Sequence, residues 1–284
     1  MAEATPVVTT EWVLKHLADP SIVVVEVNTD LDSAYHLGHV PGARGWDLHV
    51  DLEDQVRRDI PSVVQIEELL SRSGIGNCTT IVLYGDGNNR SATWAFWVLK
   101  LYRHDDVRIM DGGRKKWLID GLPLSKLRPS PAVQVYKAKA PDSSLRATKD
   151  HVLSRLGTSI LRTIDVRTLE EFTGTHPSAP DTGQAGIYRF GRIPGAVHIP
   201  WDDSASSDGS FRPAEELRLL YDDKGVGSSH DVITYCRLGV RASYSWFVLK
   251  YLLGFDRVRN YDGSWTEWGN SSGTPIEIGP TFRE

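Results

Sequence analysis

The chain has 284 residues, of which 40% are hydrophobic and 24% charged, a length and composition typical of a globular protein with two domains. A formal net charge of -5 argues against nucleic acid or an acidic membrane as a partner, and no apolar run reaches the length of about 18 residues that a membrane span requires. Residues 1–10 lack a signal-peptide pattern and the chain has only 2 cysteines, so the sequence predicts a cytoplasmic protein without a disulfide framework.

The first half of the chain alternates short apolar runs with amphipathic segments. Residues 22–27 and 81–84 are apolar and rich in β-branched side chains, which is typical of strands buried on both faces of a sheet. Residues 63–72 carry apolar side chains at helical spacing. A proline-containing stretch of little periodicity follows, so we predict a first domain at residues 1–125 and a linker at residues 126–144.

The second half shows the same alternation. Residues 160–166 and 232–235 read as buried strands, and residues 214–221 as an amphipathic helix with acidic residues near its start. We predict a second domain at residues 145–284. Strands that alternate with helices indicate an α/β fold, in which each domain is a mostly parallel sheet with helices on both faces.

The two halves also repeat one another in sequence. Matching segments occur in the same order at an offset of about 150 residues, which indicates a duplicated domain. The matched pairs are residues 39–43 with 192–196, residues 80–100 with 231–250, and residues 110–117 with 261–268.

Cys236 follows a predicted strand directly and precedes a predicted helix. In open parallel sheets ligands bind at this carboxyl edge of the strands. The helix N-terminus and the charges of Arg237 and Arg241 favour a thiolate, and Gly239 lets the loop curl so that backbone N–H groups point inward. The pattern predicts a reactive cysteine in a loop that holds an anion.

A cysteine at the end of a buried strand can instead be a small core side chain, and the repeat provides an internal comparison. At the offset of about 150 residues, Asp86 stands in place of Cys236. We therefore predict that the second domain is catalytic, and that the first is inactive and forms the opposing wall of the site.

Three motifs resemble those of the tandem-domain rhodaneses, the thiosulfate and 3-mercaptopyruvate sulfurtransferases: residues 35–43, residues 258–268, and Cys-Arg-x-Gly at Cys236. The resemblance covers nearly the whole chain, from about residue 7 to residue 278. It implies two rhodanese domains, and transfer of a sulfane sulfur from thiosulfate to cyanide, a thiol or a protein acceptor through a Cys236 persulfide. It also implies a substrate-binding loop that consists of Arg237, Leu238, Gly239, Val240 and Arg241.

Two positions depart from the thiosulfate branch of that family. Leu238 stands two residues after the cysteine, where the branch carries a cation, and Glu171 follows an Asp-x-Arg motif where another cation is expected. 3-Mercaptopyruvate is therefore the alternative donor, although Arg237 resembles the thiosulfate branch. We expect Arg90, in the matching loop of the first domain, to face Cys236 and to restore a positive charge at the substrate.

Two other classes of protein are alternatives. Rhodanese-fold phosphatases use a cysteine and an arginine six positions later, whereas Arg241 follows Cys236 by five positions, so this loop is too small for a phosphate ester. A thiol redox sensor would need a resolving cysteine, and Cys78 precedes a strand of the first domain, a poor position for that role. No cluster has metal-ligand spacing and no glycine-rich nucleotide loop occurs, so we expect neither a metal nor an organic cofactor.

Overall fold

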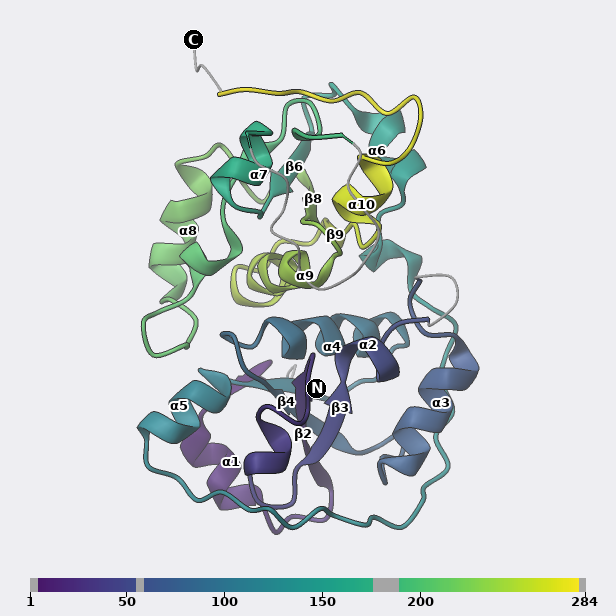
Figure 1. Cartoon of the computed structure of the whole chain (residues 1–284), viewed down its shortest axis with the longest axis vertical. Coiled ribbons are helices and arrows are strands. Elements are labelled where there is room, and N and C mark those ends of the chain that lie inside the picture. The colour runs from purple at the N-terminus through teal and green to yellow at the C-terminus, as the bar shows by residue number, and fades with distance from the viewer. Residues whose placement is uncertain (1–4, 55–58, 176–188, 281–284) are drawn as a thin grey trace. The chain divides into compact units, whose positions relative to one another are not determined.

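The chain divides into two compact units, each described here by itself (Figure 1). The computed structural model describes residues 5–54, 59–175 and 189–280. Unit 1 comprises Met1–Asp142 and Ala205–Phe211, and unit 2 comprises Ser143–Ser204 and Arg212–Glu284.

Unit 1 is built on a parallel sheet of five strands in the order β1-β5-β4-β2-β3. Its strands are β1 (Val7–Val8), β2 (Ile22–Asn28), β3 (Arg44–Asp47), β4 (Thr80–Tyr84) and β5 (Val107–Met110). Its helices are α1 (Thr10–His16), α2 (Leu48–Asp51), α3 (Val63–Arg72), α4 (Arg90–Leu101) and α5 (Gly113–Ile119), with a 3-10 turn at Tyr35–Leu37.

Helices cover both faces of this sheet. On one face Val24 and Val82 form a buried cluster with Val13 of α1 and Trp117 of α5. On the other face α4 contacts β2, β4 and β5, and Figure 1 shows α4 beside β2 and β4. Successive residues of a strand point to opposite faces, which explains why β2 and β4 are apolar at nearly every position, as the sequence predicts.

Unit 2 repeats this plan with a parallel sheet in the order β7-β6-β8-β9. Its strands are β6 (Leu161–Asp165), β7 (Val197–His198), β8 (Asp231–Tyr235) and β9 (Val258–Asn260). Its helices are α6 (Lys149–Arg155), α7 (Leu169–Thr173), α8 (Ala214–Asp222), α9 (Val240–Phe247) and α10 (Ser264–Trp268), with 3-10 turns at Ser143–Leu145 and Trp201–Ser204 and a π turn at Val248–Leu252.

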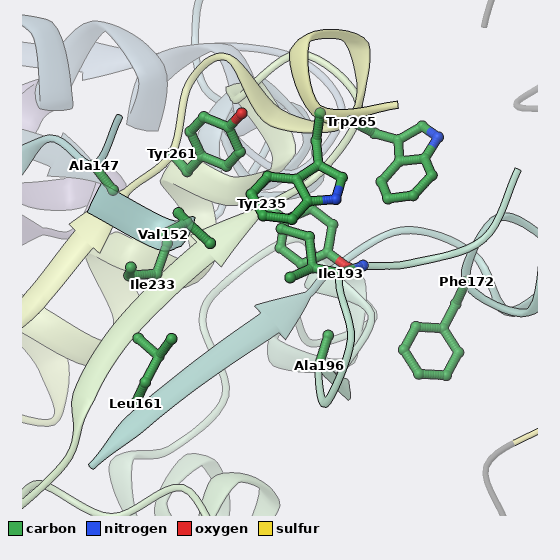
Figure 2. Packing of buried hydrophobic residues seen from close by; sticks show 11 residues of the cluster. Ala147, Val152, Leu161, Phe172, Ile193, Ala196, Ile233, Tyr235, Tyr261 and Trp265 are labelled. Atoms are coloured by element: carbon green, nitrogen blue, oxygen red, sulfur yellow. The ribbon is translucent and has the colours of Figure 1, made fainter. Parts of the chain in front are cut away.

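One buried cluster of unit 2 lies on one face of its sheet. Figure 2 shows Ile233 and Tyr235 of β8 packed with Val152 of α6 and Trp265 of α10. On the opposite face α9 contacts β8 and β9. Both sheets are therefore parallel and flanked by helices, which confirms the predicted α/β fold class.

Side-chain capping sets where several of these helices begin. Ser62 and Gln65 form a capping box at the start of α3, and Thr168 and Glu171 form one at the start of α7. The duplication extends to a buried hydrogen bond: the Val40 N–H donates to the Tyr84 hydroxyl at 2.9 Å in unit 1. The Ile193 N–H donates to the Tyr235 hydroxyl at 3.1 Å in unit 2.

The stretch that the sequence assigns to a linker lies along unit 1. The Gln134 N–H donates to the Ser71 carbonyl at 3.1 Å, and the Ala138 N–H donates to the Glu67 carboxylate at 3.1 Å. The segment Ala205–Phe211 also groups with unit 1, where the Phe211 N–H donates to the Asp111 carboxylate at 2.9 Å. A segment from the second half of the sequence is thus part of the first unit.

Candidate active site

Cys236 lies at the carboxyl end of β8, the strand that pairs with both β6 and β9. A short loop joins it to α9, which begins at Val240 and has Gly239 as its N-cap. Gly239 adopts a left-handed φ of 89°, a conformation that only glycine adopts without strain. The predicted sequence of strand, cysteine, glycine turn and helix is therefore what the structure has.

The thiol of Cys236 is buried and held by the loop backbone. Its side chain is 1% exposed, and its Sγ accepts a hydrogen bond from the Gly239 N–H at 3.1 Å. The first turn of an α-helix has unpaired N–H groups and the positive end of the helix dipole. Negative charge on this sulfur, or on a second sulfur bonded to it, is therefore favoured at this position.

The start of α10 fixes the backbone on either side of the thiol. The Cys236 N–H donates to the Ser264 hydroxyl at 3.1 Å, and the Cys236 carbonyl accepts from the Trp265 N–H at 3.0 Å. The Arg237 carbonyl accepts from both the N–H and the hydroxyl of Thr266, at 3.1 and 2.8 Å. The loop is thus anchored at two successive residues and is preorganised around the sulfur.

Arg241, in the first turn of α9, is paired with a carboxylate. Its guanidinium donates to both oxygens of Glu171 at 2.8 and 3.0 Å. Burial alone would lower the pKa of Arg241, but the hydrogen bonds that it donates to Glu171 and negative charge on Cys236 raise this pKa above its usual value. Arg241 is therefore a permanent cation whose charge is compensated by Glu171.

A second ion pair lies beneath the loop in the core. Arg167 donates to both oxygens of Asp165 and to the Gly191 carbonyl at 2.7 Å. Its guanidinium lies over the ring of Trp265 at 4.5 Å and that of Tyr235 at 5.6 Å. Burial acts to lower the pKa of Arg167, and the charge of Asp165 outweighs it, so the net shift is upward. This pair lies at the end of β6, where Asp165 pairs with Tyr235 of β8.

The structure brings the six predicted loop residues together and shows how each is placed. Arg237 is 9% exposed and held through its carbonyl, whereas Leu238 and Val240 are half-buried. Arg90 is the first residue of α4 in unit 1 and is half-buried. Its predicted position opposite Cys236 stays a prediction.

The unit 1 loop differs from the unit 2 loop by one residue. The register of β4 on β2 and of β8 on β6 places Gly85 at the position of Cys236. Counting back from the N-caps Asn89 and Gly239 instead places Asp86 there, as the constant offset in the sequence predicts. Since Gly85 and Asp86 both lack a thiol, this loop of unit 1 has no group that could carry sulfur.

Three side chains around the loop are not among the residues predicted from the sequence. Ser264 and Thr266 anchor its backbone, and the Asn260 side chain donates to the Gly239 carbonyl at 3.3 Å. All three lie within residues 258–268, the motif that carries the family resemblance. The motif indicated that this segment is important in the family. Its residue pattern alone does not show which of its side chains contact the loop.

The described parts of the chain contain no group of three or more His, Cys, Asp or Glu side chains that could hold a metal ion. Among the same residues, no helix is both long and apolar enough to cross a membrane.

Two parallel α/β units, one with a buried cysteine at the start of a helix, define the class to which this chain belongs. A sequence model described as "Rhodanese-like domain" matches residues 9–120 and 148–271. The chain therefore belongs to the rhodanese-like domain family and carries two copies of the domain. This confirms the resemblance noted from the motifs.

Full-length relatives carry related names. The chain is 45% identical over 279 residues to a Mycolicibacterium smegmatis protein named "Putative thiosulfate sulfurtransferase", covering 98% of this chain and 100% of that protein. It is 47% identical over 277 residues to "Sulfur carrier protein TtuD" of Thermus thermophilus, covering 96% of each. Among solved structures, the anaerobic ergothioneine biosynthesis enzyme from Chlorobium limicola is 25% identical with a TM-score of 0.87, covering 99% of this chain and 72% of that one.

Proposed function

We propose that the chain is a thiosulfate sulfurtransferase, which moves a sulfane sulfur from thiosulfate to a thiophilic acceptor through a persulfide on Cys236. The observation that carries the proposal is the Gly239 N–H directed at the Cys236 sulfur at 3.1 Å, at the N-terminus of α9. Sulfur-transfer names among relatives of at least 45% identity support the same reaction.

The reaction has two displacements. The Cys236 thiolate attacks the sulfane sulfur of thiosulfate, the sulfur–sulfur bond of the donor breaks, and sulfite leaves with the bonding electron pair. Cyanide or a thiolate then attacks the outer sulfur of the persulfide, which forms thiocyanate or a new persulfide and regenerates the Cys236 thiolate. No external oxidant or reductant is needed, and kinetics of the ping-pong type are expected.

The residues of the loop have distinct roles in this mechanism. The Gly239 N–H stabilises negative charge on sulfur, as a backbone donor does in an oxyanion hole. Arg237 and Arg241 are the candidates in this loop for holding the anionic donor. Leu238 and Val240, both half-buried, are the apolar side chains of the proposed substrate-binding loop.

3-Mercaptopyruvate is the second candidate donor, and the pairing of Arg241 with Glu171 favours it. A dianion such as thiosulfate gains from an uncompensated cation, whereas the monoanionic mercaptopyruvate requires less positive charge. Thiosulfate remains the first candidate because relatives of similar length carry its name. The name of the Thermus relative supports a protein or small thiol as the cellular acceptor.

The test is the intact mass of the protein after incubation with thiosulfate, and again after cyanide is added. The expected result is a gain of one sulfur atom that cyanide removes. Cys236→Ser should abolish the gain, and Cys78→Ser, which changes the exposed cysteine of unit 1, should not. A gain only with 3-mercaptopyruvate would change the donor, and no gain with either donor would overturn the proposal.

The same experiment separates the proposal from its alternatives. A phosphatase would hydrolyse an aryl phosphate and take up no sulfur. A redox sensor would gain oxygen atoms or a disulfide on treatment with peroxide instead of a sulfur that cyanide removes.

A further inference from the structure

The backbone amide at the end of the central strand is bonded to a side chain in both units. In unit 1 the Gly85 N–H donates to the Asn89 side chain at 2.9 Å. In unit 2 the Cys236 N–H donates to the Ser264 hydroxyl at 3.1 Å. The register of the central strands makes Gly85 and Cys236 equivalent. Two different side chains therefore accept a hydrogen bond from the same backbone N–H of the fold.

Each of these side chains also bonds the same carbonyl of the neighbouring strand end. The Asn89 amide donates to the Met110 carbonyl at 2.8 Å, and the Ser264 hydroxyl donates to the Tyr261 carbonyl at 2.6 Å. Met110 and Tyr261 occupy equivalent positions, because β5 pairs with β4 in the register in which β9 pairs with β8. One hydroxyl in unit 2 thus reproduces both hydrogen bonds of the carboxamide in unit 1.

The two arrangements exclude each other. Gly113 of unit 1 has a φ of 56°, and a Cβ there would lie 2.3 Å from the Asn89 side-chain oxygen. At the equivalent position of unit 2, Ser264 has a φ of 52° and carries the hydroxyl, while the N-cap is Gly239. In unit 1 the side chain that makes these two hydrogen bonds belongs to the N-cap residue Asn89, whereas in unit 2 it belongs to Ser264, the first residue of α10. Serine takes this place although left-handed backbone disfavours it.

Because Ser264 makes these hydrogen bonds in unit 2, the N-cap of α9 can be a glycine. The N–H of this glycine, Gly239, donates to the Cys236 sulfur at 3.1 Å. We propose that Ser264 is a positioning residue for sulfur transfer: it holds the Cys236 amide from outside the loop, so that the loop backbone can close on the sulfur. This inference rests on the proposed function and identifies a residue that it needs.

The test is a pair of matched glycine variants. Ser264→Gly removes these two hydrogen bonds in unit 2 and relieves the left-handed strain, whereas Asn89→Gly removes the equivalent two in unit 1. We expect Ser264→Gly to slow single-turnover loading of sulfur from thiosulfate by about tenfold to a hundredfold, with the pH midpoint of Cys236 alkylation by iodoacetamide shifted upward. Asn89→Gly should lower the melting temperature without changing the loading rate or the alkylation profile.

The double variant Ser264→Gly/Gly239→Asn places the carboxamide of unit 1 at the N-cap of the Cys236 loop, which is one residue shorter than the loop of unit 1. Asparagine tolerates left-handed backbone, so this variant should be more stable than Ser264→Gly alone and still load slowly. The proposal is overturned if Ser264→Gly loads at the wild-type rate with an unchanged alkylation profile, or if the double variant loads normally. Alkylation needs no sulfur donor, so a wild-type protein that takes up no sulfur would refute the proposed function while leaving the positioning role open to measurement.

Discussion

The guanidinium of Arg241 donates to both carboxylate oxygens of Glu171, a residue 70 positions earlier in the chain, at 2.8 and 3.0 Å. The capping box of α7 holds Glu171 in turn, since its carboxylate accepts from the Thr168 N–H at 3.1 Å. A cation in the first turn of α9 is thus compensated before any substrate arrives. The pair therefore reduces the net positive charge at the start of α9.

Replacing Glu171 by glutamine tests this balance of charge. Glutamine serves in a capping box as glutamate does, so the helix start is retained while the compensating charge is lost. Thiosulfate should then bind more tightly, and its KM should fall by a factor of about three to ten, equivalent to about 1 kcal/mol. Steady-state kinetics at low ionic strength measure the effect.

The exposed neighbour Glu170 provides the control for this variant. Glu170→Gln removes the same charge from α7 without touching Arg241, and it should change KM much less. If KM for thiosulfate rises or stays constant in Glu171→Gln, the charge of Arg241 does not act on the donor.

The Gly239→Ala variant tests the backbone donor of the site. At a φ of 89° a Cβ costs about 1–2 kcal/mol, and the loop can relieve this strain only by moving the N–H that donates to the Cys236 sulfur. Loss of one such donor slows a reaction by about a hundredfold or more. We expect sulfur loading from thiosulfate to slow by that factor in stopped-flow measurements.

Gly225 offers a matched control in unit 2. Its φ is 72°, and a Cβ there meets nothing within 4 Å, so Gly225→Ala has comparable backbone strain away from the thiol. The two variants should lose similar stability, and only Gly239→Ala should load slowly. Equal loading rates would show that the N–H of Gly239 does not stabilise the reacting sulfur.

Local pattern was sufficient to predict the conformation of the loop at Cys236. A buried strand that ends in Cys236, followed by Gly239 and a helix, is a short-range arrangement, and the sequence predicts both the loop and the parallel sheet behind it. The partner of Arg241 was not predictable in this way, because Glu171 lies on another helix and meets it only through tertiary packing. From the sequence, Glu171 was noted only as a carboxylate at a position where the thiosulfate branch of the family carries a cation.

Ser264 was not predicted for a different physical reason. Its left-handed φ of 52° is unusual for a serine, and nothing in a sequence pattern announces such a conformation at a residue other than glycine. The sequence pattern also did not predict that the unit 1 loop is one residue longer than the unit 2 loop. A constant offset assigns Asp86 to the position of Cys236, whereas strand register assigns Gly85.

The buried ion pair beneath the loop predicts a large effect on stability. The side chains of Asp165 and Arg167 are 0% and 1% exposed, so Asp165→Asn would leave the guanidinium buried without its counter-charge. Such a loss costs about 3–5 kcal/mol, which urea unfolding of the whole chain should detect in the transition of unit 2. The exposed Asp150, changed in Asp150→Asn, should alter the unfolding free energy by no more than about 0.5 kcal/mol.

A pH dependence is expected in unit 1 from His104. Burial is the main reason that its pKa lies below its usual value of 6.5, and the ring contacts the Thr79 carbonyl at 2.8 Å and the Tyr136 hydroxyl at 3.0 Å. Burial also raises the pKa of Tyr136 to about 12, so this hydroxyl stays protonated and donates to a neutral imidazole. On acidification His104 therefore takes up its proton in the unfolded chain first, and it stays uncharged in the folded state until a lower pH.

The sign of the effect follows from proton binding. Between the lowered pKa of the folded state and 6.5, the unfolded state binds more protons, so stability rises with pH in this window and falls on acidification. His104→Gln keeps one donor and one acceptor but does not titrate. Urea unfolding between about pH 5 and pH 7.5 should show a steeper loss of stability in the wild type, by at most about 1.4 kcal/mol per pH unit. Parallel curves for the two proteins would mean that His104 is protonated in the folded state as readily as in the unfolded chain.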